Sequence, residues 1–346
     1  MNNFAAVGLA GAAGLAVTAG LGFAMVPWLR KLKFGQTILD IGPKWHKSKQ
    51  GTPTMGGLMF IIGTVAAIAV TVITDKLTGG DIVASGSLVP SEMYTRLWSG
   101  LVMALSFGLI GFADDYIKIV RGRNLGLTIK QKTLAQLLVC VAYLMGLYMS
   151  MDGAPYMFVP FVGMVEIGFF HWIFGIVIIY ASVNAVNFTD GVDGLCSSVT
   201  VTAAVSLGVI AGLKGLFGFS MAAAALAGAC VGFLFWNKNP AKVFMGDTGS
   251  MFLGGMVVAL AYALGCPLIL LLAGVVYVVE GASDVLQIVY YRVTGGKRIF
   301  KMAPIHHHFE LCGWSEKKIV AVFSAVNALG GAAAGAIMYY GGYIVK

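Results

Sequence analysis

The sequence predicts an all-α polytopic membrane protein with about ten transmembrane helices and an active site on loops at the cytoplasmic face. Three observations lead to this fold class. Of the 346 residues, 58% are hydrophobic and only 11% are charged, whereas a water-soluble domain carries roughly 25% charged residues. Long apolar runs recur along the chain, and Lys and Arg are concentrated in alternate connections between them. Since no repeat or linker divides the sequence, we expect one integral-membrane domain over residues 1–346.

A helix that crosses the hydrocarbon core needs about 20 mostly apolar residues. The first such run precedes the basic residues Arg30 and Lys31, whereas a cleaved signal peptide has its charges before a shorter apolar core. We therefore expect this run to be a retained span. Between the fourth and fifth runs, residues 150–169 are expected to form a short hairpin. The ten predicted spans lie near residues 4–29, 53–73, 97–118, 130–150, 170–186, 196–213, 217–236, 248–264, 267–291 and 318–341.

Positive charge indicates which connections face the cytoplasm. Nineteen of the 23 Lys and Arg residues lie in the alternate connections that begin with residues 30–52, and only Lys76, Arg96, Lys214 and Lys346 lie elsewhere. Because cytoplasmic loops carry the excess of basic residues, both termini should lie outside. The same asymmetry explains the net charge of +8 without nucleic acid. Five cysteines without CxxC spacing are expected to be small apolar helix residues, not zinc ligands or disulfides.

Acidic residues occur together at the inner end of the third predicted span. Asp114 and Lys118 are four residues apart and share one helix face, while Asp115 points about 100° away. Two adjacent carboxylates near a low-dielectric boundary repel each other unless a cation compensates. A general base, a metal site and an interfacial Asp–Lys ion pair all fit this pattern.

A second polar segment, residues 184–194, contains Asn187, Asp190 and Asp193 with Asp-Gly twice in five residues. Such turns present side-chain oxygens and backbone N–H groups together. The segment lacks the later ligand positions of an EF-hand. A plain turn between helices needs no such density of acids and amides, so the pattern favours a functional loop.

A third segment, residues 244–250, begins the eighth predicted span with Gly246, Asp247 and Thr248. A helix N-terminus offers free N–H groups to a phosphate. Asp247 alone is compatible with a simple N-cap. Nearby Lys242 and Asn237 favour a Mg²⁺–pyrophosphate site, where a carboxylate holds the hard cation.

Two further segments are less specific. Three consecutive histidines, His306, His307 and His308, precede the last span. Adjacent side chains diverge and no HxxxH or Cys partner is present, so hydrogen bonding to phosphate or sugar is favoured over zinc. Residues 49–57 open the second span, and a helix started by Pro53 explains them without function. Neither a P-loop nor a Rossmann motif occurs.

Five phrases together resemble the phospho-N-acetylmuramoyl-pentapeptide transferases, a branch of the polyprenyl-phosphate N-acetylhexosamine-1-phosphate transferase superfamily. The resemblance covers most of the chain in the family's order, and the first and last phrases favour this branch. Residues 279–285 depart from the pattern, because Ser or another neutral residue is expected at 281–282 and no acid at position 284, where this chain has Asp284. The phrases are GTPTMGG (51–57), FADDYIK (112–118), NAVNFTDGVDGL (184–195), NKNPAKVFMGDTGS (237–250) and APIHHHFE (303–310).

The resemblance implies transfer of phospho-MurNAc-pentapeptide from UDP-MurNAc-pentapeptide to undecaprenyl phosphate, giving lipid I and UMP with Mg²⁺ as cofactor. This is the first membrane step of peptidoglycan synthesis, at the cytoplasmic side of the bacterial inner membrane. It assigns Mg²⁺ binding to Asp247 and deprotonation of the lipid phosphate to Asp114, with Asp115 beside it. Phosphates would be positioned by Lys118, Lys130 and Lys132. The nucleotide pocket would be formed by Lys49, Asn187, Asp190, Asp193 and Phe244, with Thr54, Asn237, Gln287 and His306–His308 nearby.

Two rival functions and two structural alternatives stay open on the sequence. A sibling transferase that uses UDP-GlcNAc would share the membrane core. A polytopic transporter would place ionisable residues near the midplane between repeats. Direct attack by the lipid phosphate is favoured over an aspartyl-phosphate intermediate. Gly331 and Gly335 form a small-xxx-small pair that fits packing within one chain better than a homodimer.

Overall fold

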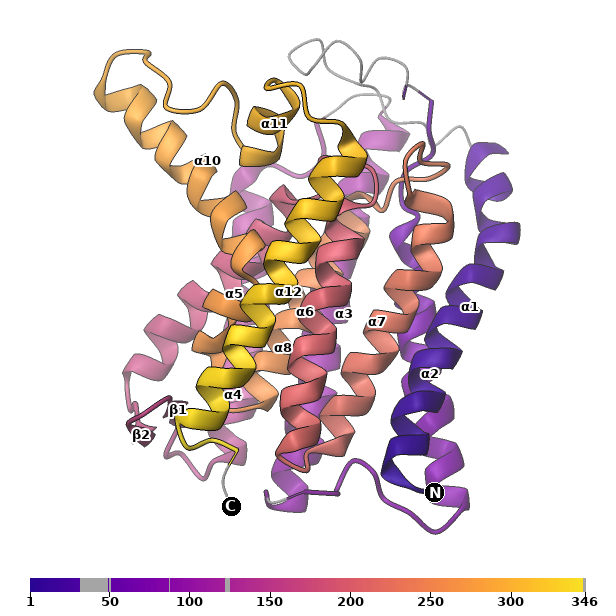
Figure 1. The fold of residues 1–346 in the computed structure, drawn as a ribbon, viewed down its shortest axis with the longest axis vertical. Helices are drawn as coiled ribbons and strands as arrows, with labels where there is room; N and C mark the ends of the chain where they lie inside the picture. Colours follow the sequence, from indigo (N-terminus) through magenta and orange to yellow (C-terminus); the bar gives the residue numbers. More distant parts are fainter. Residues whose placement is uncertain (32–48, 50, 87, 122–124, 345–346) are drawn as a thin grey trace.

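The computed structural model describes residues 1–31, 49, 51–86, 88–121 and 125–344, and shows a bundle of long helices (Figure 1). The basic residues Lys33, Lys44, Lys47, Arg123 and Lys346, and Gln50 of the segment that opens the second span, lie outside the described residues. The long helices are α1 (Asn3–Lys31), α2 (Gly57–Leu77), α3 (Pro90–Val120), α4 (Ile129–Ser150), α5 (Phe170–Phe188), α6 (Leu195–Leu213), α7 (Phe217–Asn237), α8 (Gly246–Ala263), α10 (Val275–Val293) and α12 (Glu316–Tyr340). The short elements are β1 (Tyr156–Val159), β2 (Gly163–Glu166), η2 (Pro267–Ile269), α9 (Leu270–Ala273) and α11 (Ile305–Glu310).

Within the described ranges, eight helices are long and apolar enough to cross a membrane, or nine if the bent pair around Gly274 is one span. These helices confirm a polytopic all-α membrane protein. The predicted span 267–291 is not one straight helix, because the segments on either side of Gly274 meet at 88°. Gly274 ends α9 and precedes α10 with a non-helical φ of −123°. From this bend α10 leans out of the bundle (Figure 1).

The long helix α8 lies at the centre of the bundle. It is not one of the eight candidate spans, since its first turn is polar, yet every residue from Thr248 to Ala263 is buried. Small residues allow close approach of its neighbours. A Cβ at Gly100 of α3 would lie 2.8 Å from Ala259, and one at Gly254 would lie 2.8 Å from Val183 of α5. The helix that carries Asp247 is therefore held on several sides.

The N-terminus and the C-terminal end of α12 lie at one end of the bundle, opposite α11 (Figure 1). The segment after α8 is bonded to the hairpin and to the segment after α12. The Phe158 N–H donates to the Gly265 carbonyl, and the Tyr343 hydroxyl donates to the Leu264 carbonyl. The strands β1 and β2 pair antiparallel with Tyr156 opposite Glu166, so the predicted hairpin is confirmed. Which side of a membrane this end faces stays a prediction from charge.

The two glycines of the small-xxx-small pair in α12 have different surroundings. A Cβ at Gly331 would overlap the side chain of Ser206 in α6, whereas one at Gly335 would meet no described atom within 4 Å. Gly331 therefore packs within the chain, as favoured by the sequence. Gly335 contributes nothing to that contact.

Candidate active site

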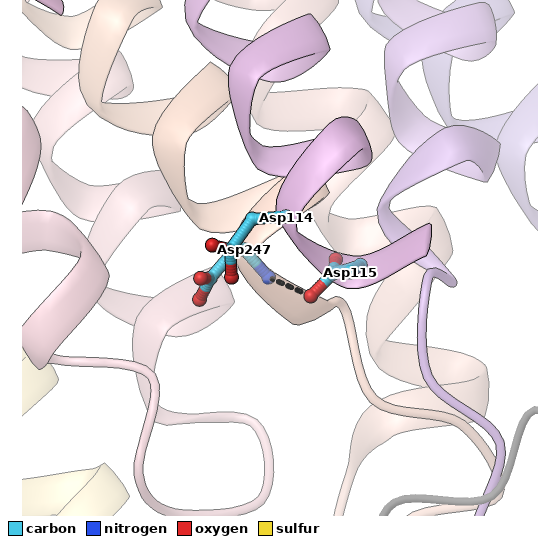
Figure 2. Close-up of side chains that lie close together, drawn as sticks. All are labelled: Asp114, Asp115 and Asp247. Carbon is cyan, nitrogen blue, oxygen red and sulfur yellow. Dashed lines mark hydrogen bonds between the residues drawn. The ribbon is translucent and has the colours of Figure 1, made fainter. Parts of the chain in front are cut away.

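Three carboxylates from two helices meet at the end of the bundle opposite the termini. Asp114 and Asp115 come from the last turns of α3, and Asp247 comes from the first turn of α8 (Figure 2). One oxygen of each carboxylate lies within 4.8 Å of the others. The carboxylates of Asp114 and Asp115 are almost completely buried, while that of Asp247 is partly open. Such a set of hard oxygen donors suits a divalent cation such as Mg²⁺.

Two lysines compensate part of this negative charge. Lys118 Nζ lies 2.6 Å from Asp114 Oδ2 and 3.1 Å from Asp247 Oδ2. Lys132 of α4 lies 2.8 Å from the same Asp247 oxygen. The predicted sharing of one helix face by Asp114 and Lys118 is confirmed. The ion pair and the acidic cluster, which the sequence left as alternatives, are both present.

The loop between α5 and α6 brings amides and acids to this cluster. Asn187 Nδ2 donates to Asp247 Oδ1 at 3.0 Å and to Ser250 Oγ at 2.7 Å. The carboxylate of Asp190 forms no hydrogen bond with a described residue. Burial, and then the negative charges of Asp247, Asp115 and Asp193, raise the pKa of Asp190 to about 8. Lack of a partner and a raised pKa are typical of a carboxylate that awaits a cation or substrate.

Asp193 has a different environment although it is only three residues away. Its carboxylate accepts from Lys49 Nζ at 2.8 Å, from the Ala241 N–H at 2.9 Å and from Asn239 Nδ2 at 3.3 Å. Lys49 also lies 2.8 Å from Glu316 at the start of α12. Asp193 therefore ties together four segments that are distant in the sequence.

The segment before α2 is joined to the start of α8 through its backbone. The Phe244 N–H donates to Pro53, and the Gly56 and Gly57 N–H groups donate to Phe244 and Met245. A Cβ at Gly57 would overlap the backbone of Gly249. The Thr54 side chain faces Gly246, where a Cβ would lie 2.8 Å from Thr54 Oγ1. The glycines of this segment thus allow the backbone of α8 to approach.

The three histidines lie in or beside the same end, each with its own partner. His306 is fully buried, and its Nδ1 lies 3.0 Å from Oε2 of the buried Glu280 in α10. Its Nε2 faces Gly191 of the α5–α6 loop, where a Cβ would overlap the ring. His307 pairs with Glu310 at 2.6 Å, and His308 Nδ1 accepts the Lys301 N–H at 3.1 Å. His306 is thus in contact with the loop that carries Asp190.

Three of the predicted substrate-binding residues, Asn237, Gln287 and Lys130, either bond to the backbone or lie outside the cluster. Asn237 accepts the Gly194 N–H at 3.1 Å and donates to Val243, which fixes the chain on both sides of the loop 238–245. Gln287 bonds only the backbone of Ile299 and Phe300. Lys130 is exposed at the start of α4 and forms no ion pair with a described residue. Their roles in substrate binding stay predictions.

Sequence reasoning missed several residues that touch the site. Thr248 and Ser250 contact Asp115 and Asn187, and Glu280 and Glu316 contact His306 and Lys49. Thr248 and Ser250 belong to a phrase that was recognised, and Glu280 to the departing segment 279–285. Glu316 follows the N-cap Ser315, so its position resembles an ordinary first-turn acid. Its contact with Lys49 is seen only in the three-dimensional structure.

Comparison with known proteins agrees with this arrangement. Residues 97–265, which include both acidic segments of the cluster, match the model of glycosyl transferase family 4. Residues 49–61 match phospho-N-acetylmuramoyl-pentapeptide-transferase signature 1. A helical membrane bundle with acidic and basic groups gathered at one end, matched by this model, defines an integral-membrane transferase.

Curated relatives give the family within this class. A phospho-N-acetylmuramoyl-pentapeptide-transferase of Listeria monocytogenes serovar 1/2a is 43% identical over 306 residues, covering 88% of this chain and 90% of the relative. Proteins of the same name from Acetivibrio thermocellus and Bacillus mycoides are 44% and 41% identical, covering 89% and 91% of this chain and 88% and 95% of their own lengths. The chain belongs to the phospho-N-acetylmuramoyl-pentapeptide-transferase family.

Proposed function

We propose that this protein transfers phospho-MurNAc-pentapeptide from UDP-MurNAc-pentapeptide to undecaprenyl phosphate, releasing UMP and forming lipid I. The family supports the reaction, and the observation that carries the proposal for this chain is the contact of Asp247 with Lys118, Lys132 and Asn187 beside Asp114. The positive-charge asymmetry supports a cytoplasmic location of this end in the inner membrane. We further propose that residues 1–346 act as one domain.

The carboxylates fit a Mg²⁺ ion because they are hard oxygen donors, and the nearby carboxylate of Asp190 has no hydrogen-bond partner among the described residues. Asp247, with Asp114 or Asp190, would hold this ion. When bound, Mg²⁺ supplies positive charge that neutralises the phosphates. The site would otherwise contain four neighbouring acids, Asp114, Asp115, Asp190 and Asp247, with two lysines.

Residues of the chain itself are assigned phosphate binding and proton transfer. Lys118 and Lys132 are placed to bind phosphate oxygens, which develop negative charge as UMP leaves. Asp114 accepts the proton of the lipid phosphate, and Lys118, whose Nζ lies 2.6 Å from Asp114 Oδ2, orients the carboxylate. The freed phosphate oxygen attacks the β-phosphorus, a new P–O bond forms, and the bond to UMP breaks. Direct attack needs no covalent enzyme intermediate.

The loop that carries Asp190 and Asp193 supports a nucleotide pocket together with Lys49 and Phe244. Lys49 and Asp193 are paired in the structure, and both belong to the network at the start of α12. The ring of His306 packs against this loop at Gly191. We propose that the uridine and ribose bind on the open side of this loop.

The test is transfer by the purified protein with undecaprenyl phosphate and radiolabelled UDP-MurNAc-pentapeptide, with and without Mg²⁺. Labelled lipid and an equal amount of UMP are expected only with the divalent ion. UDP-GlcNAc serves as the matched substrate control. Labelled lipid from UDP-GlcNAc alone would assign the protein to the sibling reaction, and substrate flux without UMP release would indicate a transporter.

A further inference from the structure

The carboxylate of Asp115 is directed at the first turn of α8. Its Oδ2 accepts the Thr248 N–H at 2.9 Å and the Thr248 hydroxyl at 2.7 Å, and its Oδ1 accepts the Asp247 N–H at 3.3 Å. The last of these bonds is drawn in Figure 2. Asp115 is 3% exposed. Both of its oxygens therefore accept from donors of α8, and Oδ1 also lies 3.8 Å from Lys118 Nζ.

These donors are groups that a helix cannot satisfy by itself. The first N–H groups of an α-helix have no partner within the helix, and a side chain just before the helix usually accepts from them. In α8 the residue at that position is Met245, which makes no side-chain cap. Asp115 of α3 supplies the missing acceptor, and its negative charge also suits the positive end of the helix.

Two glycines allow this contact. Gly246 has a φ of 69°, and a Cβ there would lie 2.5 Å from Asp115 Oδ2. Gly111 lies one turn before Asp115, and a Cβ there would overlap the backbone of Asp247 and Thr248. The two helices are thus in backbone contact where the carboxylate reaches across.

We propose that Asp115 is a positioning residue for the transfer reaction, which acts through the first turn of α8 and holds Asp247 between Lys118, Lys132 and Asn187. This inference rests on the proposed function for its effect on catalysis. It separates Asp115 from its neighbour Asp114, which points to Lys118 and accepts only the Leu127 N–H from the backbone. The resemblance placed the two acids side by side without distinguishing them.

The first test is hydrogen exchange of the amides of Asp247 and Thr248 in the purified protein without divalent ions. Asp115→Asn should increase their exchange rate about tenfold, because the cap is weakened. Thr248→Val removes only the hydroxyl donor and should have a smaller effect, and Thr248→Ser should exchange like the wild type. Asp114→Asn is the matched control, with unchanged exchange at these two amides.

The second test is a double-mutant cycle on the transfer rate. Asp115→Asn and Thr248→Val should each lower kcat about tenfold or more, and the double variant should be no slower than Asp115→Asn alone, because both act through one contact. Thr248→Ser should restore the rate, and the pH dependence of kcat should keep its shape in all variants. KM for the nucleotide should change little.

Two results would overturn the inference. One is wild-type amide exchange in Asp115→Asn together with loss of transfer, which would give Asp115 a direct role. The other is a double variant in which the fold-loss of kcat equals the product of the two single losses, as expected for two independent contacts. If Asp115→Asn does not fold, the amide exchange rates of Thr248→Val and Thr248→Ser are compared. Equal rates in these two variants would contradict the inference. Absence of transfer by the wild type would reject the proposed function, while the exchange data would still test the cap.

Discussion

Arg96 donates from Nη1 to the carbonyl oxygen of Ala263 at 3.1 Å, and so caps the C-terminal end of α8 from the neighbouring helix α3. The same nitrogen lies 3.3 Å from the Tyr262 carbonyl. Nη2 donates to Glu92, which also accepts the Tyr156 hydroxyl at 2.6 Å. A cation at the C-terminal end of a helix meets the last carbonyls and the negative end of the dipole.

Replacement of this cation should destabilise the protein. Arg96→Met leaves the buried Glu92 without its cationic partner and the last carbonyls of α8 without the Arg96 donor. We expect the free energy of unfolding to fall by about 3 kcal/mol, the range for a broken buried ion pair. Thermal unfolding in detergent measures this change. Arg121→Met, at the exposed end of α3, should unfold like the wild type, and an unchanged melting temperature in Arg96→Met would contradict the assignment.

Asp247→Asn should abolish transfer while the protein stays folded. The change removes the charge that Lys118 and Lys132 share and weakens the proposed Mg²⁺ site, so we expect the rate to fall at least about 100-fold. The rate is measured over a range of Mg²⁺ concentrations. Asp81→Asn is the control, because Asp81 is exposed at the other end and accepts from Tyr94. Near-normal Mg²⁺-dependent transfer by Asp247→Asn would remove the metal assignment.

The stability of the protein should depend on the ionisation of Asp190. Its pKa of about 8 in the folded protein lies above the ordinary value of 3.8. Below pH about 4 this carboxyl is protonated in both states and has no effect on stability. Between pH about 4 and about 8 the unfolded chain loses the proton first, so stability falls as pH rises, and above about 8 the loss is constant.

Asp190→Asn removes this effect, so its melting temperature relative to the wild type should rise between pH about 5 and about 8. The measurement is made without divalent ions, and added Mg²⁺ should reduce the difference. Asp193→Asn is the comparison in the same loop. Its carboxylate has three donors, so the variant should be less stable at every pH. A pH-independent difference for Asp190→Asn would refute the prediction.

The glycines of α12 give a matched pair of substitutions. Gly331→Ala places a methyl group against Ser206 and should lower the free energy of unfolding by about 1–3 kcal/mol, as overpacking does. Gly335→Ala meets no described atom within 4 Å and should leave the monomer unchanged. The mass of the purified particle is measured for both. A dimer that dissociates only in Gly335→Ala would show that this residue serves contact between two copies.

Much of the fold follows from the sequence because lipid imposes simple requirements. The length of the apolar runs predicts the helices, and the alternation of basic connections predicts which ends of the helices lie on one side. The turn residues of 150–169 predict the hairpin. The break at Gly274 was not predicted, since glycine also occurs inside straight membrane helices. Whether such a residue bends a span depends on what packs against it.

The segments of the site were predictable, but the partners of individual side chains were not. Asn237 and Gln287 are amides that serve backbone groups in this structure, and an amide beside a motif is equally suited to a ligand. Glu316 contacts Lys49 across 267 residues of sequence. Asp114 and Asp115 point about 100° apart on α3, but which of them meets the first turn of α8 depends on how the two helices pack. Such relations depend on packing between distant segments.

The two ends of α8 are held by one neighbouring helix, and this has a consequence for where the chemistry takes place. Arg96 and Asp115 are separated along α3 by about 29 Å at 1.5 Å per residue, close to the hydrocarbon thickness of roughly 30 Å. A lipid-anchored phosphate can only be reached at the level of the headgroups. The length of α3 between these two contacts therefore matches the distance across the hydrocarbon, which would place Asp247 at the headgroup level that the proposed reaction requires.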